Sequence, residues 1–304
     1  MSPTDKTVLV IGATGRQGGA VATRLLADGW RVRALTRSAS SPKAAALAAA
    51  GAEVVTGDLD DYASLERAAT AAWGVFSVHA GSFEGGPYGH DLDHEARSAA
   101  KLAAASRAAG VRHVVHSSGV GADTPLAAEM AMLRHKAAAE DRWRESGLPL
   151  TILRPTAFME NNFDSPRELQ DGRLSTGLLP DTYEPLIAAD DIAAFAALSF
   201  TDPDRHRGRA YTLAGDNMTQ IERAALIGRI VGREVPYEHV SIERIRQVSP
   251  GSAELLTAIN ETAIEVDIPA LRKIHPGLLT FEEWMTGIGK PLVDAYFERL
   301  DAAG

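Results

Sequence analysis

The sequence predicts an α/β fold built on a doubly wound parallel sheet, followed by a smaller, mainly helical C-terminal lobe. Three observations support this prediction. Short apolar segments alternate with helix-like segments through residues 7–155, a glycine-rich loop follows the first apolar segment, and the alternation stops after Pro155. Alternation of this kind is typical of βαβ units, whose right-handed crossovers place helices on both faces of the sheet. We therefore expect a Rossmann-like architecture.

The elements of the first part follow one another in a regular order. Strands are expected where short apolar or β-branched segments occur, at 7–12, 31–37, 53–58, 74–80, 112–118 and 150–155. Helices are expected between them, at 17–28, 41–52, 61–72, 92–109 and 130–146. Gly29 and Gly110 follow two of these helices as stop signals.

The pattern changes after Pro155. Residues 156–185 mix polar, glycine and proline residues without clear periodicity, whereas 184–200 predict a strand and a helix. A further strand is expected at 209–215, and the chain is mainly helical from residue 218. We therefore expect a nucleotide-binding domain of 1–155 plus about 186–202, and a smaller lobe of about 156–185 and 203–304.

Composition excludes several classes of function. The 304-residue chain carries a formal net charge of −9 and no basic run longer than two residues, so we expect no direct nucleic-acid partner. It has no cysteine, no apolar run of the ~20 residues that span a membrane, and no secretory signal pattern. We expect a cytoplasmic protein without a membrane partner. No metal site is expected, because His90 and His94 lack an evident third ligand.

The loop after the first strand has the spacing Gly12-x-x-Gly15-x-x-Gly18. Gly12 would let the chain turn off the strand, Gly15 would let the backbone approach a pyrophosphate, and Gly18 would let the helix pack on the sheet. The helix N-terminus would then offer free N–H groups to the phosphates. The loop residues included with these glycines in the candidate cofactor site are Thr14, Arg16 and Gln17.

The ends of the next strands indicate which dinucleotide binds. Arg37 stands where NAD-binding chains carry an acid, and an arginine there would pair with the 2′-phosphate of NADP(H). The alternative is an ordinary surface arginine. Asp58 and Leu59 follow the third strand and would border the adenine, although Asp58 could instead cap the next helix. Ala80 and Gly81 follow the fourth strand and would pass close to the ribose.

These features resemble the NmrA-like family of atypical short-chain dehydrogenases/reductases. The resemblance rests on the "VIGATGRQGG" loop, Arg37, "GDLDD", "GVRHVVHSS", "ESGLPLTILRPTAFMEN" and "IAADDIAAFAALSF". It implies NADP(H) binding in a Rossmann domain beside a small C-terminal domain. Some such proteins resemble redox sensors that act through protein partners, and others are reductases of quinones or phenylpropanoid-type substrates.

The resemblance also implies a catalytic Tyr-x-x-x-Lys pair on the helix at 130–146. Lys136 matches the ribose-binding lysine, but Met132 occupies the tyrosine position and cannot transfer a proton. Lys136 is therefore the one candidate catalytic residue, unless it is simply a solvated lysine. His135 points about 100° away around the helix and is a poor substitute acid. Ser117 stands with Ser118 at the position of the superfamily serine, where both could instead make strand-end hydrogen bonds.

Three further residues complete the candidate site by resemblance. Phe158 would wall the nicotinamide and Asn161 would bond its carboxamide or a substrate, unless Phe158 and Met159 are core residues. Arg97 matches a basic position near the cofactor. Two hypotheses remain: a redox-cofactor sensor acting through protein partners, which Met132 favours, and an NADPH-dependent reductase of small apolar carbonyl or enone acceptors.

Overall fold

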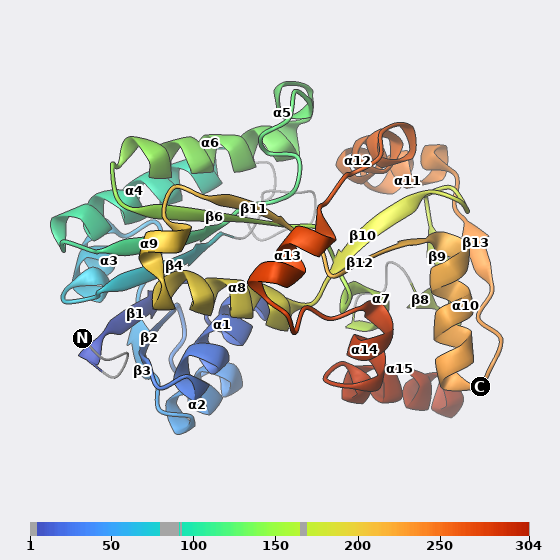
Figure 1. Cartoon of the computed structure of the whole chain (residues 1–304), viewed down its shortest axis with the longest axis horizontal. Helices are drawn as coiled ribbons and strands as arrows, with labels where there is room; N and C mark the ends of the chain where they lie inside the picture. Colours follow the sequence, from blue (N-terminus) through green and yellow to red (C-terminus); the bar gives the residue numbers. More distant parts are fainter. Residues whose placement is uncertain (1–4, 80–90, 92, 165–168, 304) are drawn as a thin grey trace. The chain divides into compact units, whose positions relative to one another are not determined.

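The chain divides into two compact units in the computed structural model (Figure 1), which describes residues 5–79, 91, 93–164 and 169–303. The first unit is Met1–Pro155 with Ile192–Thr212, and the second is Thr156–Asp191 with Leu213–Gly304. Residues 203–212, expected in the smaller lobe, fall within the first unit, because they lead into β11 (Ala210–Leu213), a strand of its sheet. Residues 186–191, expected in the nucleotide-binding domain, fall within the second unit.

A seven-stranded sheet forms the centre of the first unit, in the order β11-β6-β5-β4-β1-β2-β3. Its strands are β1 (Thr7–Val10), β2 (Arg31–Thr36), β3 (Glu53–Thr56), β4 (Gly74–Val78), β5 (His113–Ser117), β6 (Leu150–Pro155) and β11 (Ala210–Leu213). The pairs from β3 through β6 are all parallel. The predicted Rossmann-like parallel sheet is confirmed.

Helices cover this sheet on both faces. They are α1 (Arg16–Ala27), α2 (Pro42–Ala49), α3 (Tyr62–Ala69), α4 (His94–Ala108), α5 (Leu126–Glu129), α6 (Ala131–Glu145), α8 (Ala189–Thr201) and α9 (Pro203–His206). Figure 1 shows α4 and α6 on one face and α1 and α2 on the other. Leu65, Leu102 and Trp143, from α3, α4 and α6, pack with Val75 and Val114 of the sheet in one buried cluster. Because both faces are covered, the central strands β1 and β4 are mostly apolar and do not alternate, whereas the edge strand β3 is partly exposed.

The order of the strands defines where a ligand would bind. From β1 the chain proceeds to β2 and β3 on one side, whereas β4, β5 and β6 lie on the other. The order in which strands are added to the sheet therefore reverses between β1 and β4. Ligands of open parallel sheets bind at such a switch point, beyond the carboxyl ends of the strands.

The second unit combines helices with two small sheets, in the orders β12-β10-β7 and β13-β9-β8. Its strands are β7 (Ala157–Phe158), β8 (Leu169–Gln170), β9 (Arg173–Thr176), β10 (Tyr183–Ile187), β12 (Asp216–Thr219) and β13 (Tyr237–His239). Its helices are α7 (Asn161–Asp164), α10 (Gln220–Val231), α11 (Ile242–Val248), α12 (Pro250–Glu261), α13 (Ile268–Ile274), α14 (Phe281–Thr286) and α15 (Lys290–Ala303).

A separate apolar core stabilises this second unit. Phe163, Leu174, Ile227, Trp284 and Phe297 are buried together in it. The helical character predicted for the C-terminal region is confirmed, and the aperiodic segment 156–185 supplies short strands. Within the described residues, no helix is both long and apolar enough to cross a membrane.

Candidate cofactor-binding site

The glycine loop makes a tight turn between β1 and α1. Gly12 has a φ of +65°, and a Cβ there would lie 2.9 Å from Cγ1 of Val78 at the end of β4. The N–H of Gly15 donates to the carbonyl oxygen of Gly12 at 2.8 Å, and Gly15 is the N-cap of α1. The loop therefore crosses the switch point between β1 and β4 and directs the N-terminus of α1 there.

Gly18 and Gly15 have different surroundings. A Cβ on Gly18 would lie 2.3 Å from the carbonyl oxygen of Gly12, so a side chain cannot fit between α1 and the loop. A Cβ on Gly15 would meet, among the described atoms beyond its chain neighbours, only Gly12 O within 4 Å, at 3.2 Å. The backbone of Gly15 is thus exposed toward the space where a pyrophosphate would lie, as the sequence pattern predicts for a phosphate loop.

The loop is joined to the end of β5 by a side-chain hydrogen bond. Ser117 Oγ donates to Gln17 Oε1 at 2.6 Å, and Ser117 is fully buried. Ser118 is also buried, and its N–H donates to the carbonyl oxygen of Leu153 on β6. Hydrogen bonding to the glycine loop therefore accounts for the hydroxyl of Ser117, whereas the bond of Ser118 to β6 involves its backbone N–H alone. Thr14 and Arg16 of the loop are half-buried.

Arg37, Asp58 and Leu59 all lie at the same edge of the sheet. Arg37 directly follows β2 and is exposed, so its guanidinium is accessible to an anion. Asp58 Oδ1 accepts from the N–H of Asp60 at 2.9 Å, whereas Asp61 caps α3 by accepting from Ala63. Asp58 is therefore not the cap of the next helix, the alternative that the sequence left open. Leu59 packs partly against the apolar core.

Lys136 lies near the end of β5, on the other side of the switch point. Its side-chain carbons are 3.8–3.9 Å from the position of a Cβ on Gly119, two residues beyond the end of β5. Its Nζ donates to Glu95 Oε1 at 2.8 Å, and Glu95 on α4 is only 1% exposed. The ammonium is thus held by a buried carboxylate at the carboxyl end of the sheet.

The residues around Lys136 on α6 offer no evident replacement for tyrosine. Met132, one turn before Lys136, is half-buried and carries no transferable proton. His135 is buried, and burial lowers the pKa of its imidazole despite the opposing effect of Glu95. A histidine held neutral in this way does not donate a proton readily at neutral pH.

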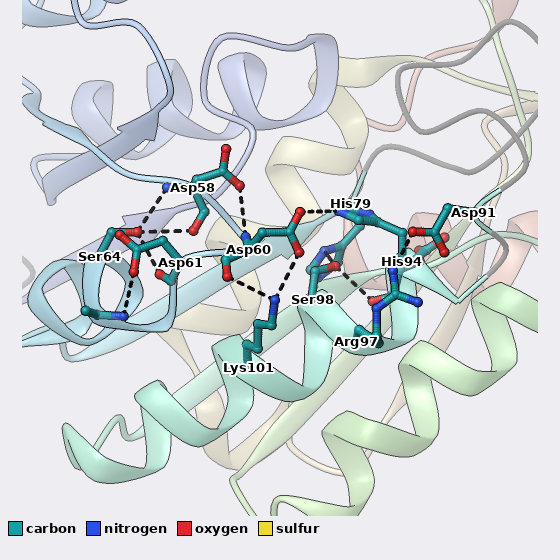
Figure 2. A network of polar contacts seen from close by, with 12 residues as sticks. Asp58, Asp60, Asp61, Ser64, His79, Asp91, His94, Arg97, Ser98 and Lys101 are labelled. Atoms are coloured by element: carbon teal, nitrogen blue, oxygen red, sulfur yellow. Dashed lines mark hydrogen bonds and ion pairs between the residues drawn. The ribbon is translucent and has the colours of Figure 1, made fainter.

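A polar network surrounds the start of α4 (Figure 2). Arg97 is exposed and its Nη2 donates to Asp91 Oδ2 at 2.5 Å. His94 pairs with Asp60 Oδ2 at 3.2 Å, and Lys101 donates to Asp60 Oδ1 at 3.0 Å. Among the described residues, no group of three His, Cys, Asp or Glu side chains could hold a metal. The positions of Ala80, Gly81 and His90 lie outside the described residues.

Phe158 and Asn161 belong to the second unit. Phe158 ends β7 and is half-buried, and Asn161 begins α7. Met159 between them is fully buried in the core of that unit, as the alternative interpretation of this turn proposed for it. The proposed contacts of Phe158 and Asn161 with a nicotinamide remain predictions.

The glycine loop, Arg37 and Lys136 all lie at the carboxyl end of the parallel sheet. Comparison with known proteins identifies the family. The model of the NmrA-like family matches residues 4–284. This chain belongs to the NmrA-like family. It is 34% identical over 240 residues to a (4-alkanoyl-5-oxo-2,5-dihydrofuran-3-yl)methyl phosphate reductase of Streptomyces griseus, covering 79% of each chain. It is 30% identical to an NAD(P)H azoreductase of Xenophilus azovorans, covering 84% of this chain and 85% of the relative.

Solved structures of this family have the same fold. An NADPH-dependent quinone oxidoreductase of Escherichia coli, complexed with NADPH, is 25% identical, with a TM-score of 0.75 over 92% of this chain and 98% of the other. The negative transcriptional regulator NmrA in complex with NADP is 20% identical, with a TM-score of 0.76 over 99% and 98%. At that identity the likeness to NmrA shows the fold alone.

Glu95 is the residue that sequence reasoning missed. Glu95 lies in the first turn of α4, where an acidic residue is favoured by the helix dipole alone. However, Glu95 is in phase with Ala99 and Leu102, both fully buried, at spacings of four and seven residues. A carboxylate on the buried face of a helix needs a partner, and this spacing was the available signal.

Proposed function

We propose that this protein is an NADPH-dependent reductase that transfers a hydride to a small apolar acceptor such as a quinone or an enone. The observation that supports this best is Lys136, which a buried carboxylate holds at the carboxyl edge of the sheet beyond β5. The two relatives at 30% identity or more named above, and the 25% identical solved structure, carry the names of reductases or oxidoreductases. The sequence favoured a sensor, on the ground of Met132 alone.

Different residues of this chain would bind different parts of NADPH at such a site. The loop from Gly12 to Gly18 and the N-terminus of α1 would bind the pyrophosphate through backbone N–H groups. Arg37 would bind the 2′-phosphate, and Lys136 would hold the nicotinamide ribose. Hydride is the chemistry that NADPH supplies when bound. With Met132 in the tyrosine position, the Lys136 ammonium is the donor best placed to stabilise negative charge on an acceptor oxygen.

Replacing Arg37 by alanine should remove the preference for NADPH over NADH. A charge-assisted hydrogen bond contributes about 1.5–3 kcal/mol, so the wild type should bind NADPH on the order of tenfold or more tightly than NADH. Titration of both cofactors into wild type and R37A measures this. Equal affinities in the wild type, or an unchanged preference in R37A, would contradict NADP(H) as the cofactor.

Replacing Lys136 by methionine should lower NADPH-dependent reduction of a quinone by at least about tenfold, because a charged donor to ribose or acceptor is lost. The measurement is steady-state NADPH oxidation across a panel of quinones and enones. Lys101→Met is the matched control, since Lys101 also pairs with a carboxylate and lies on α4. A wild type that reduces nothing in the panel sinks the reductase proposal, and a K136M variant as fast as wild type removes Lys136 from it.

A regulator that senses NADP(H) is the second candidate, favoured by Met132 at the position of the proton donor. It predicts cofactor binding without turnover. Limited proteolysis with and without NADPH, on a protein that oxidises NADPH with none of the acceptors, would support it if the cofactor changes the cleavage pattern.

A further inference from the structure

Two buried glutamates of the first unit are bonded in different ways. Glu140 on α6 uses both carboxylate oxygens: Oε1 accepts from Arg154, and Oε2 accepts from Arg154 and Arg144 at 2.7 and 2.6 Å. Glu95 is equally buried, at 1% exposure, but only its Oε1 is bonded, by Lys136. Its Oε2 is buried and has no hydrogen-bond partner among the described residues.

This difference argues against a purely structural role for Glu95. An unsatisfied buried polar atom destabilises a fold, and more so when the group is charged. Buried ion pairs often stabilise a fold no better than apolar residues of similar size, even when every oxygen is bonded. A buried carboxylate with only one oxygen bonded therefore stabilises the fold little. The effect of Glu95 on Lys136 better explains why a carboxylate is buried at this position.

We infer that Glu95 is a positioning residue for Lys136, fixing the ammonium at the carboxyl edge of the sheet and balancing its charge there. Lys136 has a long stem with several rotatable bonds, and its side chain is 17% exposed. A single charge-assisted bond of 2.8 Å to an immobile carboxylate selects one position of Nζ. The ammonium would then be preorganised for the ribose before NADPH arrives, which lowers the ordering cost of binding. The inference rests on the proposed function.

A double-mutant cycle tests this coupling. The four proteins are wild type, E95Q, K136M and the double variant E95Q/K136M, each measured for its NADPH dissociation constant and for kcat and KM with one quinone. Glutamine keeps the size of Glu95 and removes the charge. We expect E95Q to weaken NADPH binding on the order of tenfold in the wild-type background and by less than about twofold in the K136M background. E95D, which keeps the charge but shortens the reach, should fall between E95Q and wild type.

A control variant and a stability measurement separate this effect from a general loss of structure. Glu184→Gln removes a carboxylate from another buried ion pair, with Arg223 in the second unit, and should leave NADPH affinity within about twofold of wild type. Thermal unfolding of every variant reports whether it is folded. Because glutamine relieves an unsatisfied buried charge, E95Q should unfold no more than a few degrees below wild type.

Each outcome decides between the inference and the proposed function. A wild type that does not bind NADPH overturns the proposed function, and the inference with it. If wild type binds NADPH and K136M weakens it, but E95Q binds as wild type does, the proposed function stands and the inference is overturned. An E95Q loss of the same size in both backgrounds also overturns the inference, because Glu95 would then act independently of Lys136.

Discussion

Replacing Gly15 by valine is expected to abolish NADPH binding while the chain remains folded. The φ of −88° and ψ of 178° at Gly15 suit a β-branched residue, and a Cβ there would lie 3.2 Å from Gly12 O, a tight but tolerable approach. The side chain would project where the pyrophosphate must contact the backbone. Titration with NADPH and thermal unfolding of the same preparation measure both parts of the prediction.

Two other glycines give the comparison its controls. Gly251→Val in α12 introduces the same side chain where a Cβ meets nothing within 4 Å, and it should bind NADPH normally. Gly18→Val should destabilise the protein itself, because its Cβ would lie 2.3 Å from the backbone oxygen of Gly12. If folded G15V binds NADPH as wild type does, the loop is only a structural turn.

The sheet of the first unit could be predicted because its rules are local. Most of its strands are short segments rich in apolar residues, two of its helices are followed by the stop signals Gly29 and Gly110, and right-handed crossovers leave few alternatives. The position of the glycine loop then follows directly, because the loop joins the first strand to the first helix. The small sheets of the second unit lack such signals, because β7 and β8 have two residues each and β9 pairs in register with the distant segment at Tyr237.

Pairings between distant side chains were the part of the candidate site that sequence could not give. Glu95 and Lys136 are 41 residues apart and meet only because α4 and α6 pack side by side. Ser117 and Gln17 are 100 residues apart and meet across the ends of β5 and α1. Spacing along the chain determines which residues share a helix face, whereas the sheet order decides which faces meet.

Stability of the first unit is expected to fall steeply as pH decreases below about 6.5. His113 and His116 on β5 are fully buried, and burial lowers their pKa values to about 4 and about 3, from 6.5 in the unfolded chain. Burial also lowers the pKa of His79, which hydrogen-bonds Ser77 on β4. Between these values the unfolded chain binds protons that the folded chain does not, so folding loses free energy with every step toward acid.

Each such histidine lowers the free energy of unfolding by about 1.4 kcal/mol for every pH unit of acidification, between about pH 6 and the pKa of that histidine in the folded chain. His116 Nδ1 lies 3.3 Å from Ser77 Oγ, and asparagine in its place keeps a polar group for that hydroxyl. His116→Asn should therefore reduce the pH dependence of the unfolding free energy by that amount, whatever the effect of the substitution at pH 7. Urea unfolding at pH 7, 6 and 5, followed by tryptophan fluorescence, gives the slope, because Trp30, Trp73 and Trp143 lie in the first unit.

His239→Gln is the control, since that side chain is exposed on β13 and stays in solvent in both states. An H116N slope equal to that of wild type would mean that His116 carries its proton inside the folded sheet, and the neutral hydrogen-bonded arrangement of His116, Ser77 and His79 would have to be abandoned.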